Sequence, residues 1–360
     1  MDILRKLEPT NALFLLAVHG MSLVALVAYV TVLHWSWATC ALGAALLFCT
    51  SVSITGGYHR LFAHRSYAAS APVRLFYLLF GAAAFQNSAI CWSADHRRHH
   101  GKTDTDSDPY SIKRGFFWAH IGWVLARQEE PDDTSNVPDL WADPLIAFQH
   151  RHIFLLGTLV GFALPAALGA LWGDAMGAFL LAGWVRVLLQ YHATFSVNSV
   201  AHSIGGQPYS DADSSRDSVW TALITLGEGY HNYHHTFPND YRNGIRAWHF
   251  DPTKWFVSAL AWLGQTWNLK RVPWEQALKM KIRMDMRRMV LKMHTAAANR
   301  AVWEARVTQA KEQLEALLAR WEAARKAHLA EEVAQIKREF RLAYKRWSAW
   351  VRRPELAFAS

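Results

Sequence analysis

Long apolar stretches alternate with polar, histidine-rich stretches along the first part of the chain. The apolar stretches cover residues 12–33, 37–57, 153–172 and 175–197. A helix needs about 20 apolar residues to cross a bilayer, so each stretch predicts a membrane-spanning helix. The stretch "FYLLFGAAAF" at 76–85 is shorter and predicts a buried or interfacial helix. The first stretch is too long for a signal peptide, and no cleavage site follows it.

The pattern becomes polar and helical after residue 273. Apolar residues then recur three or four positions apart, as on one face of a packed helix, at Leu314, Leu318, Trp321, Leu329, Val333, Ile336, Phe340, Ala343, Trp347 and Trp350. We therefore predict two parts: a membrane domain at 1–273 and a basic helical extension at 274–360. The extension is predicted to dock on a membrane or a redox partner, or to pack on the core or on a second copy of itself.

Charge is distributed unevenly between these parts. The chain has a net charge of +9, and from residue 277 onward it contains 19 Lys/Arg against 9 Asp/Glu. A basic segment can bind nucleic acid. Next to membrane spans, however, basic residues more often face anionic lipid. We therefore expect no nucleic-acid partner.

The connections between the spans predict the topology. The first two spans are joined by "HWSW" and the last two by "GD", and neither connection contains Lys or Arg. The segment 59–151, in contrast, is rich in both. The positive-inside rule then places both termini and this middle segment in the cytoplasm. The second and fourth spans consequently end on the cytoplasmic side.

Histidines gather in the segments predicted to lie on that side. They occur as "HRLFAH", "DHRRHH", "NSVAH" and "HNYHH", which contribute His59, His64, His96, His99, His100, His202, His231, His234 and His235. In the HxxHH clusters the spacing places the rings on one side of a helix. His59 and His64 are about 140° apart on an ideal helix, so sharing a metal requires a distortion or a helix end.

Nine imidazoles are too many for one ion and suit two ions with four or five ligands each. Imidazole binds Fe, Cu, Ni and Zn, so the ligand type alone leaves the metal open. Glu228 lies three residues before His231, and no second Glu-x-x-His pair accompanies it. We therefore expect Glu228 to orient a ligand from outside the coordination sphere.

The motifs "GGYHRLFAHRSY", "DHRRHHGKTDTDSDPY", "RGFFWAHIGW" and "GEGYHNYHHTFPNDYR" resemble those of the membrane fatty-acid desaturases, in the delta-9, stearoyl-CoA-desaturase-like branch and of bacterial type. The resemblance implies an all-α integral membrane fold: four transmembrane helices, a cytosolic helical cap and the C-terminal extension. It also implies two iron ions held by the nine histidines, with Asn198 acting through water. The expected reaction is O2-dependent formation of a cis-9 double bond in a saturated acyl chain, at a bacterial inner membrane.

The same resemblance implies a set of substrate contacts. "QNSAICW" supplies Gln86 and Asn87 for the acyl carbonyl and Trp92 for the bend of the channel, while Thr194 and Phe195 shape its kink. Arg127 is placed at the head group. Gln128 and Ala94 stand where the animal enzymes have cations, which weakens recognition of CoA phosphates. An acyl-CoA is expected, with phospholipid or acyl-carrier-protein thioesters as alternatives.

Electrons for this reaction must come from another protein. The chain has no GxGxxG fingerprint, no CxxCH haem site and only three cysteines, without iron–sulfur spacing. A ferredoxin, a cytochrome or an NADPH-dependent reductase is the expected donor. Two other functions fit the same motifs: a di-iron lipid hydroxylase and a non-catalytic metal-binding membrane protein.

Overall fold

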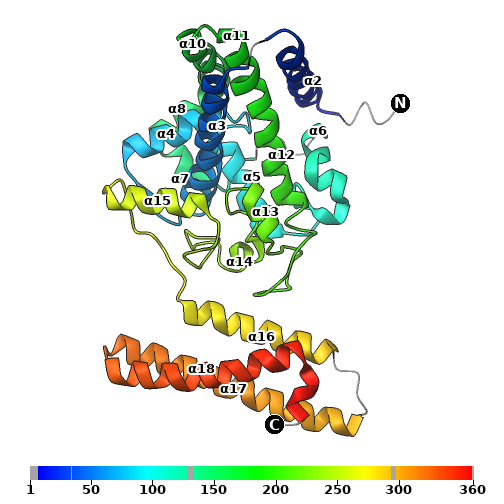
Figure 1. Cartoon of the computed structure of the whole chain (residues 1–360), viewed down its shortest axis with the longest axis vertical. Coiled ribbons are helices and arrows are strands. Elements are labelled where there is room, and N and C mark those ends of the chain that lie inside the picture. Colours follow the sequence, from blue (N-terminus) through cyan, green and yellow to red (C-terminus); the bar gives the residue numbers. More distant parts are fainter. Residues whose placement is uncertain (1–6, 34, 128–132, 293–296, 359–360) are drawn as a thin grey trace. The chain divides into compact units, whose positions relative to one another are not determined.

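The computed structural model describes residues 7–33, 35–127, 133–292 and 297–358. Within these ranges the chain is mostly helical. It divides into two compact units. The first consists of Met1–Gly206 and Asp213–Arg271, and the second of Gln207–Ala212 and Val272–Ser360. Figure 1 shows the helices of each unit.

Three helices of the first unit are long and apolar enough to cross a membrane: Pro9–Tyr29, Trp37–Ala63 and Ile153–Ala170. They correspond to three of the four predicted spans. The fourth predicted span is helical, as α11 (Ala175–Ala178), η5 (Phe179–Val185) and α12 (Arg186–Ser199). It is not among the candidates because polar residues, Arg186 and Gln190 among them, interrupt it. The membrane helices are confirmed, and a fourth span remains a prediction.

The long helices contain segments of π-helix, in which each turn is one residue wider. α2 (Pro9–Thr31) is regular, whereas α3 (Trp37–Val52) continues into the π-helix η1 (Ser53–Ala63). The third span consists of α9 (Ile153–Thr158), the π-helix η4 (Leu159–Ala163) and α10 (Leu164–Ala170). π-Helical turns frequently occur at functional sites.

Two connections lack basic residues: the one between the first two predicted spans and the one between the last two. The structure brings these two connections together. Trp172 Nε1 donates to Thr39 Oγ1 over 3.0 Å, and Thr39 Oγ1 donates to Asp174 Oδ2 over 2.5 Å. Trp35 and Trp37 are largely exposed beside them. Tryptophan favours the boundary between lipid and water, so this end of the helices has the features of a membrane surface.

Short elements between the long helices form the rest of the first unit. They are α4 (Ala71–Ala82), α5 (Ala89–Lys102), η2 (Ile112–Arg114), η3 (Trp118–Gly122), α6 (Trp123–Leu125), α7 (Pro138–Trp141), α8 (Pro144–Arg151), α13 (Val219–Ile224), α14 (His231–Thr236) and α15 (Pro252–Trp262). Two short antiparallel strands, β1 (Ala68–Ala69) and β2 (Thr266–Trp267), pair Ala68 with Trp267. The buried core around Tyr58, Tyr77 and Ile90 packs η1 against α4 and α5.

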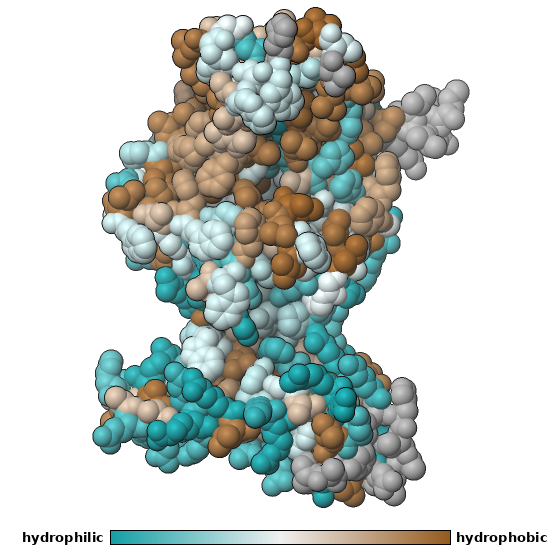
Figure 2. Space-filling view, in the orientation of Figure 1, coloured by the Kyte–Doolittle hydropathy of each residue, from teal (hydrophilic) through white to brown (hydrophobic). Residues whose placement is uncertain are grey.

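The second unit contains α16 (Trp274–Lys292), α17 (Ala297–Lys326), α18 (Ala330–Arg352) and η6 (Pro354–Phe358). Its core buries Trp303, Leu314, Ile336 and Trp347. The predicted helical extension is interrupted between α17 and α18, and the apolar seams of these two helices pack on each other. Between them His328 adopts a left-handed conformation, with φ of 57°. Figure 2 shows that the visible surface of this unit is mainly hydrophilic, while brown apolar patches extend over the first unit.

Candidate metal centre

Four segments bring the nine histidines together. His59 lies in η1 and His64 follows its last turn, His96, His99 and His100 lie on α5, His202 follows α12, and His231, His234 and His235 lie on α14. The π-helix η1 places His59 and His64 on one face although they are five residues apart. A π-turn closes between residues five apart, and the His64 N–H donates to the His59 carbonyl over 3.0 Å. The two rings are therefore on the same face, with centroids 4.9 Å apart.

The nitrogens form two groups, and within each group the candidate ligand atoms all lie within 4.8 Å of one another. The first group contains five residues: His59, His64, His96, His100 and His234. The second contains four: His99, His202, His231 and His235. No histidine is shared, so the geometry offers two adjacent sites.

The inner nitrogens face one another at short distances. Nε2 of His59 lies 2.9 Å from Nε2 of His234, and Nε2 of His64 lies 2.8 Å from Nε2 of His96. In the second group, Nε2 of His231 lies 3.1 Å from Nε2 of both His202 and His235. A neutral imidazole has only one N–H, so the position of that proton decides whether such pairs attract or repel.

Acceptors on the outer nitrogens fix these protons. Nδ1 of His59 lies 2.9 Å from Glu228, Nδ1 of His99 lies 2.8 Å from Asp108, and Nδ1 of His202 lies 2.8 Å from the Ser214 hydroxyl. A proton on Nδ1 leaves a lone pair on Nε2. One such lone pair, on His59, then faces the group of five, and two, on His99 and His202, face the group of four. Nε2 of His99 is buried without a hydrogen-bond partner among the described residues. The donor set therefore fits metal cations.

Burial favours the neutral form, which binds metals, in several of these imidazoles. Burial, and then the neighbouring histidines, hold the pKa of His64, His96 and His100 well below the ordinary value. The same causes lower the pKa of His202 and His231. Neutral imidazole suits iron, copper, nickel and zinc, so the geometry does not select among them.

Three of the outer acceptors were not assigned from the sequence. Asp108 lies in the quoted "TDTDSDPY" motif, and Asp213 lies 3.4 Å from Nδ1 of His235. Ser214 precedes the turn to α13 and also bonds to Asp104. The signal that could have found them is a cluster of Asp and Ser close to each histidine motif. A cluster of that kind is common in loops and does not specify a partner.

A network of buried charged and polar side chains surrounds Glu228 and stabilises its charged form. Burial alone would raise the pKa of this carboxyl, but His59 and Arg60 outweigh burial and lower it to about 2. The Arg60 guanidinium lies 2.8 Å from Glu228 and 3.1 Å from Asp251, and Asn243 donates to Glu228 over 2.7 Å. All four side chains are at least 97% buried. The network connects η1 with the start of α15.

The two glycines of "GEGYH", Gly227 and Gly229, leave room for neighbouring residues to pack closely on either side of Glu228. Gly227 has φ of +102°, and a Cβ there would lie 2.7 Å from Asp251 Oδ1. At Gly229 a Cβ would lie 2.1 Å from the Ala222 nitrogen. A side chain at either position would therefore displace Glu228 from His59.

The predicted channel residues lie on α5, on α12 and in the segment before α5. Trp92 stacks on His96, with ring centroids 4.9 Å apart, and Phe195 is buried against Tyr191. Gln86 Nε2 donates to Thr194 Oγ1 over 2.9 Å, which links the segment before α5 to α12. Asn87 follows with a positive φ of 70° and is exposed.

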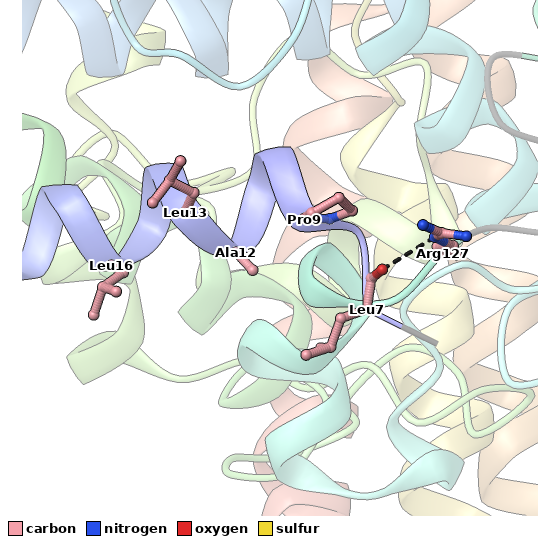
Figure 3. A pocket seen from close by; sticks show the side chains of 6 residues that line it. All are labelled: Leu7, Pro9, Ala12, Leu13, Leu16 and Arg127. Atoms are coloured by element: carbon pink, nitrogen blue, oxygen red, sulfur yellow. Dashed lines mark hydrogen bonds between the residues drawn. The ribbon is translucent and has the colours of Figure 1, made fainter. Parts of the chain in front are cut away.

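Arg127 lies at a different place, beside the start of α2. Its Nε donates to the Leu7 carbonyl over 3.1 Å, and its side chain lines an open pocket of about 370 Å³ with Leu7, Pro9, Ala12, Leu13 and Leu16 (Figure 3). The pocket is apolar apart from Arg127. Gln128 lies outside the described residues, and Ala94 is buried on α5.

The predicted residue Asn198 and the buried Arg186 both lie along α12. Asn198 is half-buried in the last turn, four positions before His202. Arg186 is buried and donates to three backbone carbonyls, those of Ala182, Ala83 and Gly161. Gly161 and Ala182 belong to the π-helices η4 and η5, whose wider turns leave carbonyls available. Arg186 therefore ties the two helices together.

Comparison with known proteins identifies the family. Residues 35–261 match the family model described as "Fatty acid desaturase". The chain is 48% identical over 226 residues to a "Probable acyl-CoA desaturase" of Schizosaccharomyces pombe, covering 62% of this chain and 47% of that protein. It is 40% identical over 271 residues to the "Delta(9)-fatty-acid desaturase fat-5" of Caenorhabditis elegans, covering 74% of this chain and 81% of that protein. It is 36% identical over 268 residues to the human "Stearoyl-CoA desaturase", covering 73% and 72%.

The chain belongs to the fatty acid desaturase family, as its motifs predicted. The match covers most of the first unit and ends before residue 272, where the main part of the second unit begins. The chain spans about half the length of the yeast relatives it matches. The predicted bacterial type is not borne out, because these relatives come from yeasts, a nematode and mammals.

Proposed function

We propose that this chain is an O2-dependent acyl desaturase that introduces a cis double bond, at position 9, into a saturated acyl-CoA. The convergence of nine imidazoles in two groups carries the proposal, because removal of hydrogen from an alkane exceeds what acid and base side chains achieve. The names of the relatives, acyl-CoA, stearoyl-CoA and delta(9)-fatty-acid desaturase, support the substrate and the position.

The nine histidines would hold two iron ions, five in one group and four in the other. When bound, the ions supply the oxidising chemistry toward O2 that the side chains lack. Asn198, through a water molecule, would complete the group of four. Glu228 and Asp108 accept the Nδ1 protons of His59 and His99, and so keep the Nε2 lone pairs directed inward.

The other residues would position the acyl chain and exclude water. Trp92 covers the group of five, Phe195 and Thr194 shape the bend, and Gln86 with Asn87 would hold the acyl carbonyl. Arg127 would pair with a head-group phosphate. Its position beside lipid-facing leucines also suits a phospholipid, which keeps that substrate as the alternative.

The proposed topology has four spans with a cytosolic helical cap around the metal centre. The junction of Thr39, Trp172 and Asp174 supports it, because it joins the two connections without basic residues. Both termini and the site would then be cytoplasmic. The desaturase domain would be 1–273, and 274–360 a separate extension. A ferredoxin, cytochrome or reductase would deliver electrons from that side.

A turnover assay tests this function. The iron-loaded full chain is reconstituted in lipid with O2 and a reducing system, and labelled stearoyl-CoA, stearoyl phospholipid or stearoyl-acyl-carrier-protein is supplied. Conversion of the CoA thioester to a 9-unsaturated product is expected. Hydroxylated product would replace the proposal with a hydroxylase. Absence of any product from all three substrates, with two irons bound, would favour a metal-binding protein without catalytic activity.

A further inference from the structure

α18 presents a strip of cations that the described part of the chain does not neutralise. Between residues 337 and 353 it has one acidic residue, Glu339, and seven basic ones. All seven are exposed: Lys337, Arg338, Arg341, Lys345, Arg346, Arg352 and Arg353. None of them forms an ion pair with a described residue. We call these seven residues the α18 basic strip.

α17 shows that this arrangement is not a general property of the unit. Four of its exposed cations are paired with acids: Arg300 with Glu304, Arg320 with Glu339, Arg325 with Glu275 and Lys326 with Glu322. Even the acid within the strip pairs with a cation of α17 rather than of α18. The positive charge of the unit is therefore concentrated on one helix face.

The geometry of α18 makes this face continuous. At 100° per residue, Lys337, Arg341 and Lys345 lie within an arc of about 80°. Ile336, Phe340 and Trp347 lie on the opposite side and are buried in the core of the unit. Leu342 lies among the cations and is 72% exposed. The face therefore combines charge with one protruding apolar side chain, as in helices that lie on membranes.

We propose that the α18 basic strip docks on an anionic lipid surface. Charge complementarity supports this, because each Lys or Arg near an anionic membrane strengthens binding about fivefold. The connection also supports it. The second unit follows directly after Arg271, the last residue of the membrane unit, so docking is intramolecular and needs little affinity per contact. The proposal extends beyond desaturation and does not depend on it.

Fluorescence of the full chain in nanodiscs tests this proposal. Leu342→Cys carries an environment-sensitive dye, in a chain with Cys40→Ala and Cys49→Ala, while Cys91 is buried. Nanodiscs contain either phosphatidylcholine alone or added phosphatidylglycerol, and a lipid-borne quencher reports contact. We expect quenching and a blue shift with phosphatidylglycerol only, and reversal by salt.

Two matched triple variants decide whether the strip is responsible. Arg338→Gln, Arg341→Gln and Lys345→Gln together should shift the docked-to-undocked ratio about a hundredfold toward the undocked form. The control, Arg287→Gln, Arg300→Gln and Lys326→Gln, removes the same charge from positions paired with acids outside the strip and should leave the ratio nearly unchanged. Circular dichroism establishes that both variants are folded.

Three results would overturn the proposal. Equal quenching with and without anionic lipid would show that charge does not drive the contact. An equal loss of docking in the two triple variants would show that docking depends only on the net charge of the protein and not on the α18 basic strip. If lipid has no effect, and the α18 variant raises the concentration of an acidic electron carrier needed for half-maximal turnover, the strip binds that protein instead.

Discussion

Glu228 Oε2 lies 2.9 Å from Nδ1 of His59, although the two residues belong to distant motifs. The sequence predicts that Glu228 orients a metal ligand but does not identify which histidine it contacts. The structure pairs it with a histidine of the π-helix η1. One carboxylate therefore fixes the proton of a histidine in the group of five, while its own backbone leads into α14, which contributes histidines to both groups.

From this pairing we expect Glu228 to affect metal affinity. Replacement by Gln keeps the shape but removes the charge that stabilises the N–H of His59, so we expect metal affinity to fall about 10- to 100-fold. Metal content is measured after dialysis against graded chelator concentrations. Glu355→Gln, at an exposed position in η6, is the control. Unchanged affinity in Glu228→Gln would show that the contact has no role in binding.

Arg60 is expected to contribute strongly to stability. Arg60→Met leaves Glu228 and Asp251 buried without their cation, which should destabilise the first unit by about 3–5 kcal/mol. The comparison is Arg65→Met, which breaks an exposed pair with Asp139 and should cost about 1 kcal/mol or less. Thermal unfolding in detergent measures both. Similar melting temperatures for the two variants would contradict the account.

Gly227 tests whether steric room, rather than backbone freedom alone, matters in the "GEG" turn. Gly227→Ala adds a clash with Asp251 to the strain of a positive φ, so its cost should exceed about 2 kcal/mol. Gly264 also has a positive φ, of 69°, but its Cβ position is open. Gly264→Ala should therefore cost only about 1 kcal/mol. Equal melting temperatures for the two variants would rule out the clash.

Metal removal should destabilise the first unit. Without cations the Nε2 lone pairs of each group face one another, and binding to the folded state alone adds stability by mass action. We expect a chelator to lower the melting temperature and ferrous iron to restore it. His234→Ala should show a smaller chelator effect, because one group has lost a ligand. A melting temperature insensitive to chelator in the metal-loaded protein would argue against the site.

The histidine motifs and the membrane helices could be predicted because each leaves a local pattern. Clusters such as "HRRHH" and runs of apolar residues are visible within a single window of sequence. The apolar seam after residue 313 also indicated packed helices, but the division between them at His328 was not predicted. That break depends on the packing of α17 against α18, which no local pattern encodes.

The remaining features depend on long-range contacts. The π-helix that aligns His59 with His64 has no distinct composition, and the need for a distortion was inferred only from the spacing. The pairing of Asp108 with His99, and of Arg60 with Asp251, joins separate elements. Arg186 is visible in the sequence as a charge within an apolar stretch, yet its partners are backbone carbonyls that the sequence does not mark.

Fatty-acid analysis of a host that expresses this chain tests the central claim most directly. Double bonds are located by mass spectrometry, in membranes from cells that carry the wild-type chain or His234→Ala. We expect new 9-unsaturated acyl chains with the wild type and none with the variant. An unchanged profile with the iron-loaded wild-type protein and a competent electron donor would contradict the assignment.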